Sequence, residues 1–99
     1  MDKLAILIPA HNELKNLKKI LDNKLKFFIV DDCSTDGTEK FLIDNKYQYI
    51  KNDTQIGYES AVLKGFNYLL NNFNDIEAIC TFDGDNEHPK EDIEKIYNY

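Results

Sequence analysis

The chain has 99 residues, of which 42% are hydrophobic, enough for a single domain over residues 1–99 with a modest core. Its formal net charge is −6 and its basic residues are lysines spread thinly along the chain, which argues against nucleic acid as a partner. No stretch approaches the roughly 20 apolar residues of a membrane span, and the first apolar run is too short for a secretory signal, so a cytoplasmic location is expected.

Four short and nearly unbroken apolar runs predict strands of a parallel sheet that is covered on both faces. They are Leu4–Ile8, Phe27–Val30, Tyr47–Ile50 and Ala78–Phe82.

Segments with helical spacing separate these runs. The first carries apolar residues from Leu14 to Leu21, the second extends from about Asp36 to Asn45, and a fourth begins at Pro89. The third is the longest, and it places seven small or apolar residues on one face: Ala61, Val62, Gly65, Phe66, Leu69, Leu70 and Phe73. This alternation of strand and helix predicts an α/β fold, a Rossmann-like doubly wound parallel sheet.

The right-handedness of crossovers places the second strand beside the first and the third beyond it. The long third helix then returns the chain to the other side of the first strand, so the predicted strand order is 3-2-1-4. Ligands of such sheets bind at the carboxyl ends of the strands, near the switch point between strands 1 and 4.

Polar clusters follow three of the predicted strands, namely Pro9–Glu13, Asp31–Ser34 and Asp83–Pro89. Carboxylates gathered at one edge of a sheet are costly unless a cation or hydrogen-bond donors compensate their charge. The first two clusters each allow a ligand-binding and a structural interpretation. Asp31 or Asp32 binds a base or ribose, or else caps the next helix, and Cys33 and Cys80 are expected to be small, buried and reduced.

The cluster after the fourth strand predicts a metal site. Asp83 and Asp85 stand two positions apart, so their side chains can point the same way, and Glu87 continues the spacing. Gly84 lets the backbone approach a ligand closely. Oxygen ligands of this kind suit Mg²⁺ or Mn²⁺, although a polar turn before a helix has a similar composition.

Taken together, the segments Ile6–Glu13, Ile29–Thr38 and Asp83–Pro89 resemble the first part of family 2 glycosyltransferases of the GT-A fold, in the same order and over essentially the whole chain. The last segment is most similar to the branch that includes dolichyl-phosphate mannosyltransferase and bacterial polyprenyl-phosphate sugar transferases. The resemblance implies metal-dependent binding of a UDP- or GDP-sugar, followed by inverting transfer of the sugar to an acceptor.

Carried over by position, the resemblance implies a nucleotide pocket lined by Pro9, Ala10, His11, Glu13, Asp32, Gly57, Tyr58, Asp83 and Gly84. It also implies metal ligands at Asp83, Asp85 and Glu87. His11 would stack on the base or fill a turn, and Glu13 would bind ligand or favour the helix start. The chain departs from the family pattern at Gln55, where asparagine is usual, and at Cys33 and Glu59, where glycine is common. A carboxylate at Glu59 would weaken diphosphate binding unless it points away.

A complete GT-A domain is longer than this chain, and the family's acceptor pocket and catalytic base lie in its second half. We therefore expect the partial GT-A domain of a longer protein, without a catalytic residue of its own and inactive in transfer alone. In the full-length protein it would work in the cytoplasm or at the membrane surface. An exposed edge at the fourth strand predicts self-association, most simply as a homodimer.

Two other functions carry similar features. A non-catalytic nucleotide-sugar-binding module would have the same motifs. An Asp-based phosphotransfer or receiver domain also carries acidic residues at strand ends, but its acidic pair follows the first strand, whereas Asp83 and Asp85 follow the fourth. The sequence has neither a Walker loop nor a Gly-x-Gly-x-x-Gly fingerprint, which excludes the commonest nucleoside-triphosphate and dinucleotide binders.

Overall fold

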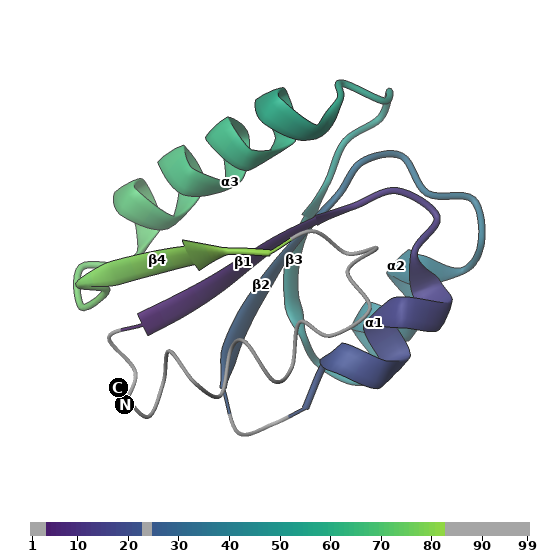
Figure 1. Ribbon diagram of the computed structural model, residues 1–99, viewed down its shortest axis with the longest axis horizontal. Coiled ribbons are helices and arrows are strands. Elements are labelled where there is room, and N and C mark those ends of the chain that lie inside the picture. Colours follow the sequence, from purple (N-terminus) through teal and green to yellow (C-terminus); the bar gives the residue numbers. More distant parts are fainter. Residues whose placement is uncertain (1–3, 23–24, 83–99) are drawn as a thin grey trace.

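The computed structural model describes residues 4–22 and 25–82, which form a four-stranded sheet with helices on both faces (Figure 1). In chain order the elements are β1 (Leu4–Ala10), α1 (Leu14–Ile20), β2 (Lys26–Asp31), α2 (Thr38–Asp44), β3 (Gln48–Lys51), α3 (Tyr58–Asn72) and β4 (Ala78–Thr81). The strands are parallel and their order is β3-β2-β1-β4, so the predicted fold class and strand order are confirmed. The fourth helix predicted at Pro89 lies outside the described residues.

The two central strands divide the core into two layers. Side chains alternate across a strand, so Ile6 and Ile8 of β1 pack on one face with Leu17 of α1 and Leu42 of α2. Leu7 points to the other face, where α3 covers it. Both layers require apolar residues at successive positions, which explains the unbroken apolar runs of β1 and β2. The outer strands β3 and β4 are shorter and partly exposed.

Helix α3 contacts the sheet through a narrow stripe of residues spaced by four, Ala61, Gly65 and Leu69. A Cβ atom on Gly65 would lie 2.6 Å from Leu7 Cδ1, so the helix backbone sits unusually close to β1. The predicted buried face was too broad. Phe66 and Leu70 each follow a stripe residue by one position, which turns them about 100° around the helix, and they are 39% and 54% exposed.

Strands β3 and β4 are the two edges of the sheet in the part of the chain that the structure describes. Self-association through β4 remains a prediction. No helix within residues 4–22 and 25–82 is long and apolar enough to cross a membrane. Cys33 and Cys80 are free, and both are only half-buried where burial was predicted. Partial burial raises the pKa of the Cys80 thiol.

Candidate functional site

A cavity of about 230 Å³ opens where β1 and β2 end and α3 begins. It is smaller than the roughly 300–1,000 Å³ of pockets for drug-sized ligands, so it is too small to enclose a whole ligand of that size. Every predicted pocket residue in the described part of the chain lines it: Pro9, Ala10, His11, Glu13, Asp32, Gly57 and Tyr58. The fold therefore gathers these residues in one place, and their contact with a nucleotide remains a prediction. Asp83 and Gly84 lie outside the described residues.

Asp32 forms the buried wall of the cavity and is only 4% exposed. Its carboxylate accepts hydrogen bonds of 2.9 Å from the backbone N–H groups of Ile56 and Gly57, and a third of 2.9 Å from Asn52 Nδ2. Burial raises the pKa of this carboxyl, but the three donors outweigh burial and the pKa is lowered. The ionised Asp32 therefore holds the segment from Asn52 to Gly57 against the end of β2.

His11 and Glu13 form the opposite side of the cavity, in the connection from β1 to α1. His11 Nδ1 lies 2.7 Å from the backbone oxygen of Asp32, which can only accept, so Nδ1 is the donor. Glu13 is the N-cap residue of α1, yet its side chain makes no capping bond and instead accepts a hydrogen bond of 3.1 Å from Asn16. Its place at the start of α1 suits a favourable charge at the helix N-terminus, and this role and ligand binding both remain predictions.

Gly57 and Tyr58 close the cavity at the start of α3. Gly57 has φ 92° and ψ 165°, a backbone conformation that is essentially restricted to glycine. This conformation directs the Gly57 N–H at Asp32 and sets the direction of α3. The Tyr58 side chain follows at the cavity mouth and is half exposed, so its ring is available to a ligand.

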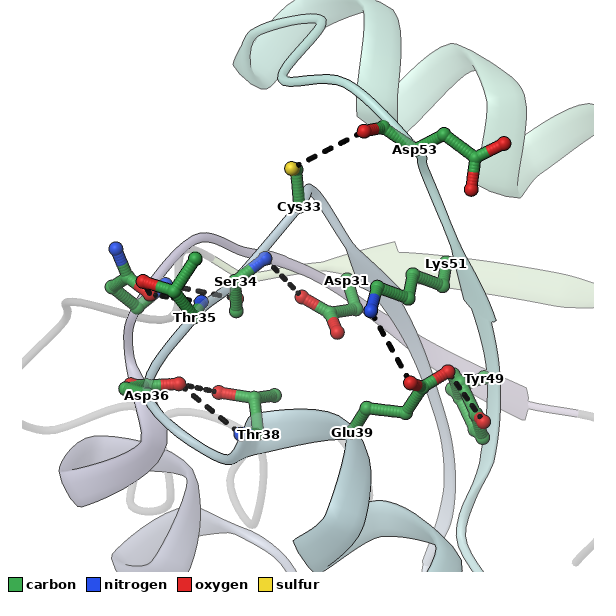
Figure 2. Close-up of polar contacts among 11 residues, drawn as sticks. Asp31, Cys33, Ser34, Thr35, Asp36, Thr38, Glu39, Tyr49, Lys51 and Asp53 are labelled. Atoms are coloured by element: carbon green, nitrogen blue, oxygen red, sulfur yellow. Dashed lines mark hydrogen bonds and ion pairs between the residues drawn. The ribbon is translucent and has the colours of Figure 1, made fainter.

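The neighbouring Asp31 forms a hydrogen bond within the turn after β2 (Figure 2). It is fully buried, and its Oδ1 accepts a hydrogen bond of 3.0 Å from the Ser34 backbone N–H. Its Oδ2 has no hydrogen-bond partner within residues 4–22 and 25–82. Because successive side chains of a strand point to opposite faces, only Asp32 of the pair lines the cavity, and Asp31 stabilises the turn that follows β2.

Helix capping was the alternative role for Asp31 or Asp32, but Asp36 performs it instead. Its Oδ1 accepts from the Thr38 backbone N–H and from the Thr38 hydroxyl (Figure 2), and its Oδ2 accepts from the Leu14 N–H at 3.0 Å. Thr38 is the first residue of α2 and Leu14 is the first residue of α1. One carboxylate therefore joins two helix starts and fixes the loop that carries His11. Burial raises the pKa of Asp36, but these donors outweigh burial and the pKa is lowered.

The predicted metal ligands Asp83, Asp85 and Glu87 lie outside the described residues. Within residues 4–22 and 25–82, no group of three His, Cys, Asp or Glu side chains could hold a metal ion. The last described residue, Phe82, donates its backbone N–H to Leu7 O at 3.0 Å, so the chain that leads into Asp83 runs beside β1.

The three departures from the family pattern have distinct structural outcomes. Cys33 has φ 63°, in the left-handed region that favours glycine, which explains why glycine is common at this position. Gln55 lines the cavity, whereas the exposed Glu59 is not among its lining residues.

Three residues of the site were not predicted. Gln55 and Ala61 line the cavity, and Asn52 supports Asp32 from behind. Asn52 directly follows β3, so its position as a polar residue at the end of the third strand is the signal that marks it. Ala61 carries no such signal, because small residues on a buried helix face are common.

Comparison with known proteins agrees with this architecture. Residues 5–99 match the family model described as glycosyl transferase family 2. Similar proteins include an undecaprenyl-phosphate 4-deoxy-4-formamido-L-arabinose transferase of Proteus mirabilis, 28% identical over 97% of this chain and 33% of that protein. A dolichol-phosphate mannosyltransferase of Pyrococcus furiosus is 32% identical over 95% of this chain and 29% of that protein. The chain spans about a third of the length of these two relatives.

Among solved structures, S. aureus TarS is similar in fold. One crystal structure covers 97% of this chain and 31% of its own, with a TM-score of 0.66 and 19% identity. A second, in complex with UDP, covers 97% of this chain and 32% of its own, with a TM-score of 0.59 and 21% identity.

Proposed function

Because the chain belongs to glycosyl transferase family 2, we propose that its cavity at the ends of β1 and β2 binds the nucleotide of a UDP- or GDP-sugar. The observation that carries this proposal is the meeting of three chain segments, Pro9–Glu13, Asp32 and Gln55–Tyr58, around one cavity. A TarS structure of similar fold was determined in complex with UDP, which supports a nucleotide as the ligand.

The chemistry of the cavity suits the nucleoside end of the donor. The carboxylates of Asp32 and Glu13 accept hydrogen bonds, which ribose hydroxyls and base N–H groups can donate. The rings of His11 and Tyr58 offer faces on which a base stacks. None of the lysines in residues 4–22 and 25–82 lines the cavity, so we place the phosphate groups outside it, where they need a cation from elsewhere.

That cation is a bound Mg²⁺ or Mn²⁺. Asp83, Asp85 and Glu87 would hold it, and three carboxylates form the oxygen-only donor set that these ions prefer. When bound, the ion neutralises charge on the diphosphate, which makes the nucleoside diphosphate a better leaving group.

The names of two relatives support a lipid phosphate as the acceptor. These relatives act on undecaprenyl phosphate and dolichol phosphate, both of which are lipid phosphates. The full-length protein transfers its sugar to a polyprenyl phosphate, which places the reaction at the membrane surface. The described part of the chain contributes donor binding to that reaction.

Titration calorimetry with UDP and GDP, each with and without Mn²⁺, tests the proposal. We expect one nucleotide to bind in a Mn²⁺-dependent manner, and the matching nucleoside to compete for the same cavity. Tyr58→Ala should weaken binding about fivefold or more through the loss of base stacking. Asp85→Asn should remove the effect of Mn²⁺ while the nucleoside still binds.

Lys40→Met is a matched control, because Lys40 pairs with Asp44 on the exposed side of α2 and is absent from the cavity. The proposal is wrong if neither nucleotide binds in the presence of Mn²⁺. It is also wrong if Tyr58→Ala and Lys40→Met have the same effect on affinity.

A further inference from the structure

Lys64 of α3 reaches a buried polar group outside the cavity. Its Nζ lies 2.5 Å from Asn52 Oδ1, although the lysine itself is exposed. Asn52 is only 2% exposed, and its backbone N–H donates to Asp31 O at 2.8 Å, which fixes it at the end of β3. Its Nδ2 donates to Asp32 Oδ1 at 2.9 Å. The amide of Asn52 therefore connects the ammonium of Lys64 to the carboxylate of Asp32.

The two charges permit only one orientation of this amide. The amide oxygen faces the ammonium and the amide nitrogen faces the carboxylate, so both hydrogen bonds are charge-assisted. Rotation by 180° would place oxygen against carboxylate and NH₂ against ammonium, and both contacts would be repulsive. Lys64 thereby stabilises the amide orientation in which Asn52 donates to Asp32.

The packing of α3 brings Lys64 to this position. Its neighbour Gly65 has no side chain, and the close approach of the helix to Leu7 and Val30 depends on that absence. The exposed lysines Lys40 and Lys51 pair with exposed or half-exposed carboxylates, and such surface pairs contribute little to stability. Lys64 differs from both because its partner is buried and is bonded to the cavity wall.

We propose that Lys64 is a positioning residue for the nucleotide cavity. It acts through Asn52 on Asp32, and Asp32 in turn holds the segment from Asn52 to Gly57. Lys64 does not line the cavity. Its effect passes through Asp32 to the backbone N–H groups of Ile56 and Gly57. The proposal rests on the proposed function only where ligand affinity is measured.

Amide hydrogen exchange tests the proposal without a ligand. Lys64→Met removes the ammonium and keeps the length of the side chain. We expect the amides of Ile56 and Gly57 to exchange about fivefold faster, because each loses part of its hydrogen bond to Asp32, while core amides of β1 and β2 stay unchanged. Lys40→Met, which removes the same charge from α2, should leave all of these amides unchanged. Unaltered exchange at Ile56 and Gly57, or equal acceleration in β1, would overturn the proposal.

A double-mutant cycle then tests the route through Asn52. Asn52→Leu should accelerate exchange at Ile56 and Gly57, and adding Lys64→Met should then have no further effect. Additive effects would show that Lys64 acts by another route and would overturn the proposal. Calorimetry with the nucleotide that binds the wild-type chain should show the same non-additivity in affinity. If neither UDP nor GDP binds the wild-type chain, the proposed function fails, and the exchange cycle still decides the role of Lys64.

Discussion

Two regions at the carboxyl ends of the strands are held together in opposite ways. The loops after β1 and β2 are joined by many hydrogen bonds among exposed or half-exposed residues, among them Asn12, Leu14, Ser34, Thr35 and Asp36. The segment after β3 is held chiefly by one buried carboxylate, that of Asp32, which accepts from two successive backbone N–H groups and from Asn52. Single contacts with Asp31 O and Cys33 Sγ add to it. In the first region, many hydrogen bonds share the stabilisation. In the second, most of it comes from one residue, which also lines the cavity.

The largest expected effect is that of Asp32→Ala. It leaves the N–H groups of Ile56 and Gly57 without their acceptor, and we expect the free energy of unfolding to fall by about 2–4 kcal/mol. Urea denaturation measures this loss. Asp32→Asn keeps one acceptor oxygen and should cost less. A loss from Asp32→Ala no larger than that from Asn12→Ala would contradict the contrast between the two regions.

The same carboxyl predicts a pH dependence. Burial raises the pKa of Asp32, but hydrogen bonds from Ile56, Asn52 and Gly57 outweigh it and the pKa is lowered. A carboxyl with a lowered folded-state pKa stabilises the fold above its unfolded pKa of about 3.9, and this stabilisation is lost as the pH falls through the folded-state pKa. Urea titrations at pH 7 and at steps below pH 4 should show a smaller acid-induced loss for Asp32→Ala than for the wild-type chain. Equal losses would show that Asp32 is not the titrating group.

Gly57→Ala should destabilise the chain by about 1–3 kcal/mol, because φ 92° with ψ 165° is strained for any other residue. Among the residues that the structure describes, no atom beyond Gly57 and its two chain neighbours lies within 4 Å of an added Cβ, so we attribute the cost to the backbone conformation. Gly37→Ala is the matched control in the first region, since Gly37 has φ 91° with ψ 10°. That conformation is less restricted, and the thermal midpoint should fall less. A larger fall for Gly37→Ala would contradict this order.

Asp36→Ala should cost about 1–2 kcal/mol, because both α1 and α2 lose the acceptor at their first residue. Circular dichroism during urea denaturation measures the change. The loss should be smaller than for Asp32→Ala, since the other hydrogen bonds between these loops remain. The reverse order would show that Asp36, rather than the distributed contacts, holds the first region together.

Cys33→Gly should change the free energy of unfolding least, by less than about 1 kcal/mol. Glycine removes the strain of φ 63°, but it increases the entropy of the unfolded chain, and the Sγ contact with Asp53 O is lost. Cys33→Ala keeps the strain and loses the contact, so its thermal midpoint should be below that of Cys33→Gly. Equal midpoints would show that the conformation of residue 33 carries no cost.

The strand order was predictable because two features of the sequence constrain it. The central strands are covered on both faces and therefore show unbroken apolar runs, and the 15-residue helix α3 is long enough to return the chain to the far side of β1. The exposed side of α3 was not predictable in the same way. Phe66 and Leu70 fit the helical period, but the period does not reveal how wide a stripe the sheet covers.

The site was predicted in part for a related reason. Strand alternation requires Asp31 and Asp32 to face opposite ways, but the sequence does not say which of them faces the cavity. The contact of Lys64 with Asn52 joins residues 12 positions apart, and it depends on how closely Gly65 lets α3 approach the sheet. Such contacts come from packing distances that no local pattern encodes.

The segment after β3 is anchored through its backbone, so its conformation depends little on the side chains at its exposed positions. Asp32 holds N–H groups, which every residue except proline possesses, so exposed positions such as Thr54 and Gln55 can change while the chain keeps its course. Gln55 also contributes to the cavity. Under the proposed function, libraries of variants at Thr54 and Gln55 would therefore be the place to alter ligand preference at little risk to folding.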